Sequence, residues 1–114
     1  MIIHKETYES GRWFKFSIFE QMANIGSEVE RTIHWKKTGD LELSRKAFER
    51  ALELIDFTVR DQKNKGCGRL KEILRTREAL VDHFVYDNEY NTTDEEWQRY
   101  FYDFTYAAAL QRGR

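Results

Sequence analysis

The sequence of 114 residues contains no proline and only one cysteine. At the average usage of about 5%, a chain of this length would carry about five or six prolines. Because proline breaks the interior of helices, its absence favours long uninterrupted helices. A single cysteine excludes an intrachain disulfide and paired CxxC metal motifs. The composition therefore predicts a helical protein of a reducing compartment.

Long hydrophobic runs and an excess of charge are also absent. A membrane-spanning helix needs about 20 apolar residues, and the longest apolar run here, residues 106–110, is far shorter. The first residues show neither the apolar region nor the small-residue cleavage site of a secretion signal. Lysine and arginine number 19 against 20 acidic residues, so no bulk attraction to nucleic acid or membrane follows. We expect a soluble, cytoplasmic protein without a membrane partner.

The length fits a single domain, residues 1–114. We divide it into a short N-terminal arm, residues 1–16, and a helical bundle, residues 17–112. The arm is expected to pack on the bundle through its aromatic side chains, which are Tyr8, Trp13, Phe14 and Phe16.

Capping signals place the first two helices of the bundle. Ser17 and Glu20 match a capping box, in which two side chains satisfy two backbone N–H groups at a helix start. Gly39 suits the end of that helix, and Asp40 suits the start of the next. Gly26 lies inside the first helix, where it predicts a close approach of another helix.

Two further helices complete the bundle. The third is expected from Arg69 to Tyr86, and Thr93 with Glu96 forms a second capping box for a fourth helix that ends near Gln111. The apolar seam predicted for the third helix consists of Leu70, Ile73, Leu74, Leu80, Val81 and Phe84. Four helices with short connections predict an all-α, antiparallel four-helix bundle.

The charges are unevenly distributed along the chain. Basic residues dominate residues 60–77 and acidic residues dominate residues 78–103, so the bundle is expected to have a basic end and an acidic end. The basic end is a candidate for binding phosphate or RNA through Lys63, Lys65, Arg69 and Lys71. Two alternatives remain open: ordinary solvation with helix-dipole complementation, and self-association of opposite ends.

Arg77 falls on the predicted apolar seam of the third helix. A buried unpaired charge costs several kcal/mol, so this arginine needs an acidic or polar partner. Asn24, Glu28 and Asp56 are the candidates. A paired Arg77 would be a structural ion pair, whereas an Arg77 that faces a cleft would be a functional residue.

Arg77 and His83 are separated by five residues, and the polar Glu78 follows the arginine. This pattern resembles the signature of the HEPN family of small all-helical domains, and the resemblance covers residues 17–112. It implies that the domain binds RNA, a nucleotide or a nucleotidyltransferase-type partner, as in toxin–antitoxin pairs. In family members that cut RNA without a metal ion, the arginine stabilises phosphate charge and the histidine transfers a proton at a dimer interface. Those catalytic roles would fall to Arg77 and His83.

The fourth helix is rich in aromatic residues around most of its circumference. A helix of this kind lies centrally in its bundle or faces a second subunit. Tyrosine suits interfaces that are partly apolar and partly wet. We therefore expect a homodimer whose interface includes Trp97, Tyr100, Tyr102 and Tyr106.

Other chemical signatures are missing from the sequence. It has no nucleophile elbow, P-loop or dinucleotide-binding motif, so no cofactor is expected. Glu30 and His34 lack the further ligands of a metal site, and Cys67 lies in a basic loop without a fixed base. The sequence favours a non-enzymatic protein. Two functional hypotheses stay open: a HEPN-like module, and a homodimeric interaction or scaffold protein that recruits another protein.

Overall fold

The computed structural model describes residues 11–66 and 68–113. Within these ranges the secondary structure is entirely helical, which confirms the all-α fold. The elements are α2 (Arg12–Lys15), α3 (Ile18–Thr38), α4 (Leu41–Arg60), the short 3-10 helix η1 (Gln62–Asn64), α5 (Arg69–Phe84) and α6 (Asp94–Arg112). The expectations for Tyr8 and Cys67 lie outside the described residues.

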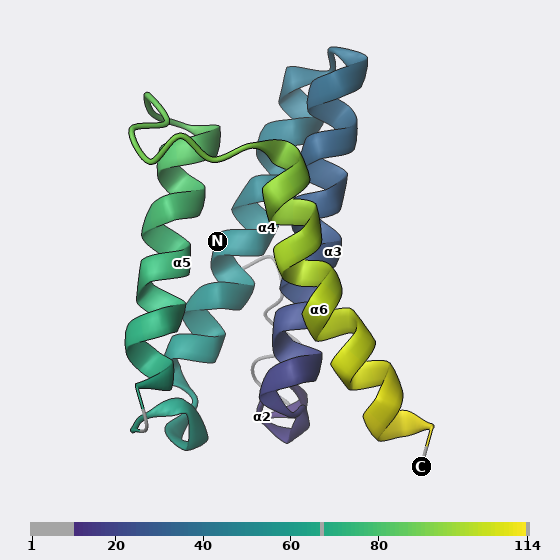
Figure 1. Cartoon of the computed structure of the whole chain (residues 1–114), viewed down its shortest axis with the longest axis vertical. Helices are drawn as coiled ribbons and strands as arrows, with labels where there is room; N and C mark the ends of the chain where they lie inside the picture. Colours follow the sequence, from purple (N-terminus) through teal and green to yellow (C-terminus); the bar gives the residue numbers. More distant parts are fainter. Residues whose placement is uncertain (1–10, 67, 114) are drawn as a thin grey trace.

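The four long helices run alternately in opposite directions (Figure 1). Helices α3 and α4 lie side by side along most of their length, α6 packs against α3, and α5 packs against α4. Figure 1 shows that α6 slants away from α5 toward its C-terminal end. The arrangement is the antiparallel four-helix bundle predicted from the sequence. None of the described helices has the length and apolar character needed to cross a membrane.

The helix starts follow the predicted capping signals. The Ser17 hydroxyl accepts the Glu20 N–H, and the Glu20 carboxylate accepts the Ser17 N–H in return. Thr93 and Glu96 make the same reciprocal pair at the start of α6, and the Asp40 carboxylate accepts an N–H at the start of α4. Both capping boxes are thus confirmed, and each satisfies backbone donors that have no partner within the helix.

The helix ends agree less closely with the prediction. Gly39 ends α3 in the left-handed region, with φ of 90°, as expected of a glycine at this position. Helix α5 ends at Phe84, two residues before the predicted end at Tyr86. The backbone turns off the helix here because the Val85 and Tyr86 N–H groups both bond to the Val81 carbonyl.

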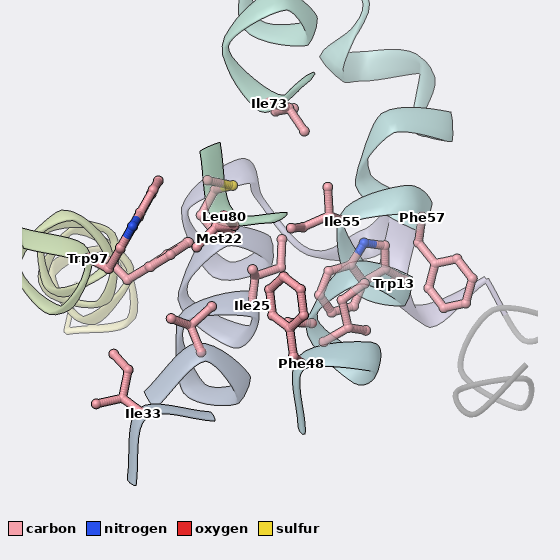
Figure 2. Close-up of a cluster of buried hydrophobic side chains, with 14 residues drawn as sticks. Trp13, Met22, Ile25, Ile33, Phe48, Ile55, Phe57, Ile73, Leu80 and Trp97 are labelled. Atoms are coloured by element: carbon pink, nitrogen blue, oxygen red, sulfur yellow. The ribbon is translucent and has the colours of Figure 1, made fainter. Parts of the chain in front are cut away.

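The hydrophobic core collects side chains from α2 and from all four long helices (Figure 2). Trp13 brings the N-terminal arm into this core: it is 2% exposed, and its indole N–H donates to the Thr58 hydroxyl on α4. The predicted packing of the arm through its aromatic residues is therefore confirmed for Trp13. The largest fully buried apolar side chains of the long helices are Phe57, Ile25, Ile33, Ile55, Leu80 and Val29.

Gly26 marks the crossing of α3 and α6, as predicted. A Cβ atom built on Gly26 would lie 2.6 Å from the Cβ of Phe101 and 3.0 Å from its Cγ. These distances are shorter than any van der Waals contact between carbon atoms. Because the Cβ of Phe101 is fixed to the backbone of α6, only a shift of the whole helix would make room for a side chain.

We expect Gly26→Ala to destabilise the protein despite the higher helix propensity of alanine. Overpacking costs about 1–3 kcal/mol, whereas alanine gains about 1 kcal/mol over glycine within a helix. The net loss of unfolding free energy should reach about 2 kcal/mol and be larger for Gly26→Val. Urea denaturation measures it. Ser27→Ala, at the neighbouring exposed position, is the control. An equal gain of stability in both variants would contradict the close approach of α6 to Gly26.

Candidate functional site

Arg77 projects from α5 toward α4, where its Nε donates to Asp56 Oδ1 over 2.9 Å. The partner is one of the three candidates named from the sequence. Arg77 does not lie on the buried side of α5, where the periodicity placed it, because its side chain is 38% exposed and that of Asp56 is 41% exposed. The buried face of α5 is formed by Ile73, Thr76 and Leu80, and Arg77 lies beside this stripe. The pair is therefore a surface ion pair, typically worth about 0–1 kcal/mol.

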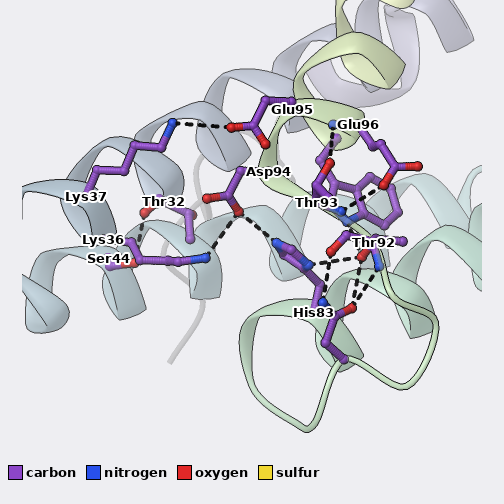
Figure 3. A network of polar contacts seen from close by, with 12 residues as sticks. Thr32, Lys36, Lys37, Ser44, His83, Thr92, Thr93, Asp94, Glu95 and Glu96 are labelled. Carbon is purple, nitrogen blue, oxygen red and sulfur yellow. Dashed lines mark hydrogen bonds and ion pairs between the residues drawn. The ribbon is translucent and has the colours of Figure 1, made fainter.

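His83 lies near the end of α5 in a network of polar side chains (Figure 3). Its imidazole is 6% exposed. The ring bonds to Asp94 Oδ1 through Nε2 over 2.7 Å and to the Thr92 hydroxyl through Nδ1 over 2.9 Å. Lys36 of α3 donates to the same Asp94 oxygen over 3.1 Å, and the Trp97 indole N–H donates to Thr92 over 3.0 Å. The network thus ties the end of α5 to the start of α6 and the end of α3.

The hydrogen-bond partners of His83 determine which ring nitrogen donates and which accepts. A carboxylate only accepts, so Nε2 carries the proton that is donated to Asp94. A neutral ring then accepts the Thr92 O–H at Nδ1. A protonated ring donates from Nδ1 to Thr92, and the Thr92 hydroxyl donates to Asn88 Oδ1, which lies 3.2 Å away. Both protonation states have a complete set of partners, as expected of a histidine with a structural role.

Arg77 and His83 do not line a common pocket in this chain. Arg77 borders a pocket on the outer face of α5, and His83 is not among the residues that line it. Six residues along a helix correspond to a rotation of about 240°, which turns the two side chains to different sides. Each is engaged with different partners, Asp56 in one case and Asp94 with Thr92 in the other. The shared cleft that the HEPN resemblance implies is absent from the described part of one chain.

The four residues expected to bind phosphate are all near the turn between α4 and α5. Two of them already contact the protein: Lys63 forms an ion pair with Asp61 and donates to the Phe14 carbonyl over 3.1 Å, and Arg69 donates to Asn64 over 3.5 Å. Lys65 and Lys71 are exposed. A basic end therefore exists, but two of the four side chains expected to bind phosphate also hold the turn in place.

The acidic end contains basic residues that the charge pattern along the sequence did not reveal. Lys36 and Lys37 end α3 beside the start of α6, where they pair with Asp94 over 3.1 Å and with Glu95 over 4.0 Å. These lysines lie beside the start of α6 because α3 runs antiparallel to α6, so that the end of one helix is next to the start of the other. The negative charge at the start of α6 is consequently partly neutralised within the chain.

The aromatic residues expected at a dimer interface divide into two groups. Trp97 is 7% exposed and belongs to the core of its own chain, and Tyr100 is half-buried with its hydroxyl 3.0 Å from that of Thr76. Tyr102 and Tyr106 are 63% and 57% exposed. Of the four expected interface residues, Tyr102 and Tyr106 are thus the two that lie open to a second chain, because the chain itself already covers most of Trp97.

A pocket on the outer face of α5 has no counterpart among the sequence motifs. It has a volume of about 580 Å³ and lies between α5 and the loop of residues 85–92. Leu74, which was predicted to lie on the buried seam, is instead 46% exposed and lines this pocket. We call the surface formed by the following residues the α5 face: Leu74, Arg77, Glu78, Val81, Asp82, Tyr86, Asp87, Glu89 and Tyr90.

The loop beside this pocket is held in a defined shape. Both oxygens of the buried Asp82 accept backbone N–H groups, those of Glu89 over 2.9 Å and Tyr90 over 3.1 Å. Asn88 adopts a positive φ of 53°, which asparagine tolerates better than most residues, and its side chain bonds to the Thr92 backbone. A pocket with a preorganised wall loses little entropy when a partner binds.

Comparisons with known proteins return no matching family model, no matching curated protein and no matching solved structure. Among the described residues, no three histidine, cysteine or acidic side chains gather as they would around a metal ion.

The Asp94 network makes stability depend on pH. Burial alone would raise the pKa of Asp94, but hydrogen bonds from His83 and Lys36 outweigh it and lower the pKa. A carboxylate whose pKa is lowered in the folded protein stabilises the fold at pH values above its pKa in the unfolded chain, which is about 4. This contribution is lost as the pH falls through the folded pKa. Asp94→Asn should therefore lower the urea midpoint at neutral pH and flatten its decline in acid.

The comparison variant for this prediction is Glu95→Gln, next to Asp94 in the same turn of α6. Its carboxylate is 67% exposed and lies 4.0 Å from Lys37, so its removal should change the urea midpoint little. Urea denaturation at several pH values between about pH 2 and pH 7 spans the range in which Asp94 titrates. If the urea midpoints of the wild type and Asp94→Asn changed with pH in parallel, the Asp94 network would not contribute to the pH dependence of stability.

Proposed function

We propose that this chain is a non-catalytic interaction module that recruits another protein through the α5 face. One observation carries the proposal: large apolar side chains are exposed around a concave pocket on a preorganised surface. Tyr86 is 71% exposed, and Leu74 and Tyr90, which line the same pocket, are exposed as well. Contiguous apolar surface around a pocket is typical of interaction sites.

The state of the two predicted catalytic residues also supports this proposal. A catalytic histidine needs access to its substrate, whereas His83 is enclosed and fully hydrogen-bonded. A phosphate-binding arginine acts best when its positive charge is unpaired, whereas the charge of Arg77 is already paired with Asp56. The HEPN-like RNase is the competing hypothesis.

The proposal is tested by removing the apolar side chains of the α5 face. The double variant Leu74→Ser/Tyr86→Ser should retain its stability, because exposed side chains contribute little to folding. Its control is Leu41→Ser/Leu43→Ser, which removes two exposed apolar side chains outside the pocket. A partner captured from cell extract in stoichiometric amount should be lost with the first variant alone, and the purified partner should bind it at least about tenfold more weakly.

The competing hypothesis is tested on the same preparations with a labelled-RNA cleavage assay. The wild type, Arg77→Ala and His83→Ala are compared after circular dichroism has confirmed that each is folded. We expect no cleavage by any of them. Cleavage by the wild type that is lost in both variants would overturn the proposal in favour of a metal-independent RNase.

The proposal includes self-association through the exposed side of α6. Tyr102, Tyr106 and Leu110 are all about half exposed or more, and their spacing of four residues places them on one stripe of the helix. A second copy that packs on this stripe would leave the α5 face open. Light scattering should give the mass of a dimer for the wild type and of a monomer for Tyr102→Glu/Tyr106→Glu. A wild-type monomer at high concentration would refute this part of the proposal.

A further inference from the structure

The α5 face combines its apolar residues with an excess of negative charge. Its pocket is lined by four carboxylates and by one basic side chain, Arg77. The charge of Arg77 is already compensated by Asp56 on α4. The electrostatic potential in the pocket is therefore set by the carboxylates.

Three of the four carboxylates are available to a ligand. Both oxygens of Asp82 are engaged by the backbone of the loop, so Asp82 has a structural role. Glu78 accepts the Tyr90 hydroxyl through one oxygen, over 2.9 Å. The side chains of Asp87 and Glu89 are exposed and make no hydrogen bond or ion pair within the described part of the chain. Their charges point to a cationic partner group.

The apolar part of the pocket suits the same kind of ligand. Lysine and arginine pack their methylene stems against apolar surface while the charged end stays at the edge. Leu74 and Val81 supply that surface along α5. Tyr86 and Tyr90 add two aromatic rings, which attract cations through their faces. Carboxylates, rings and aliphatic side chains thus surround one concave space.

The Tyr90 hydroxyl responds to the negative field of this region. The hydrogen bond to Glu78 and the charges of Glu78, Asp82 and Glu89 raise the pKa of Tyr90. The same field repels phosphate, so the pocket disfavours RNA. A partner that brings positive charge would instead be attracted, with an association rate that falls as salt is added.

We propose that the partner of the α5 face presents a segment rich in lysine or arginine, with apolar residues among them, to this pocket. The inference rests on the proposed function and specifies the chemistry of its partner. The cationic ends would contact Asp87, Glu89 and the free side of Glu78. The apolar residues of the segment would cover Leu74 and Tyr86.

An unbiased peptide selection tests this inference. The purified full chain is used to select from a random peptide library displayed on phage, and the selected peptides are titrated by fluorescence anisotropy at low and high salt. We expect enrichment of lysine and arginine beside apolar residues, with affinity that decreases as salt increases. Enrichment of acidic or uncharged sequences would overturn the inference.

Charge-neutral variants decide whether the selected peptides use this pocket. The double variant Asp87→Asn/Glu89→Gln keeps the side-chain shapes and should weaken binding about tenfold, since exposed ion pairs contribute up to about 1 kcal/mol each. The matched control Glu72→Gln/Asp103→Asn removes two exposed carboxylates outside the pocket and should leave the affinity unchanged. Equal effects of both double variants would overturn the inference.

The outcomes separate this inference from the proposed function. Binding that is lost in Leu74→Ser/Tyr86→Ser but unchanged in Asp87→Asn/Glu89→Gln would refute the cationic partner and retain the interaction module. Loss of binding in neither variant would refute both. A wild-type dimer that dissociates only in Asp87→Asn/Glu89→Gln would show that the basic end of a second copy is the cationic occupant, which supports the inference and refutes the recruitment of a different protein.

Discussion

Replacing Trp13 with alanine is expected to lower the free energy of unfolding by about 3–5 kcal/mol, the usual cost of removing a large buried aromatic side chain. Trp13 is 2% exposed, and its ring packs edge-on against Phe16 with centroids 5.6 Å apart. The substitution also removes the N–H that donates to Thr58. A helix of four residues has little stability of its own, so α2 depends on its contacts with the bundle, and Trp13 is the residue of α2 that is buried there.

Two comparison variants separate the contributions to this effect. Trp13→Phe keeps much of the apolar surface but leaves the Thr58 hydroxyl without its donor, and it should cost about 1–2 kcal/mol. Trp35→Ala removes the same side chain from a position that is only partly buried, so its cost should be smaller. Urea denaturation followed by circular dichroism gives all three values. An equal loss for Trp13→Ala and Trp35→Ala would show that the arm does not contribute to the core.

The helix boundaries were predictable because their signals are local. Ser17 with Glu20 and Thr93 with Glu96 act on backbone groups within one turn, so neither depends on the rest of the fold. Gly26 was informative for a related reason: glycine inside a helix is costly and is retained here where Phe101 comes too close for a Cβ atom. Such features can be interpreted without knowledge of the helix that lies opposite.

The buried side of α5 was not predictable to the same degree. This helix carries two apolar stripes, one with Ile73 and Leu80 and another with Leu74 and Val81. Periodicity alone merges them into one broad seam. The structure buries the first stripe against the bundle and leaves Leu74 in the open pocket. The placement of Arg77 on the apolar seam has the same origin, because the periodicity treats both stripes as one inward-facing side.

The polar contacts between distant segments were also beyond the sequence pattern. His83 and Asp94 come together only because the loop of residues 85–92 returns the chain to the end of α5. The bond between Trp13 and Thr58 joins residues that are 45 positions apart. No motif spacing records such pairs, whereas the capping boxes have a fixed spacing of three residues. The resemblance of Arg77 and His83 to a catalytic pair shows how spacing alone leaves the partners of each residue undetermined.

A second polar network, around Gln21, joins the arm to the turn after α4. The buried Gln21 amide donates to the Trp13 carbonyl over 3.1 Å and to Asp61 Oδ2 over 2.8 Å. Its oxygen accepts an N–H of Asn64, which also donates to the Thr58 carbonyl. Burial alone would raise the pKa of Asp61, but hydrogen bonds from Lys63 and Gln21 lower it. Gln21 thus has a partner for every polar atom of its side chain.

Gln21→Leu is therefore expected to lower the unfolding free energy by about 3 kcal/mol or more. The leucine would fit the site approximately, but Trp13, Asp61 and Asn64 would each lose a partner in a buried region. Every buried group left unsatisfied costs about 1–3 kcal/mol. The pKa of Asp61 should also rise toward its ordinary value, so stability should fall less steeply in acid than in the wild type. Urea midpoints at neutral and acidic pH measure both effects.

The control for this prediction is Gln98→Leu, which changes a glutamine on α6 that donates to Glu30 of α3 over 2.8 Å at the surface. Its groups remain accessible to water, so the variant should lie within about 0.5 kcal/mol of the wild type. If both glutamine variants were equally stable, the Gln21 network would contribute no more than a surface hydrogen bond. A large loss in Gln21→Leu alone would show that the fold depends on these polar contacts as well as on Trp13 to hold the N-terminal arm.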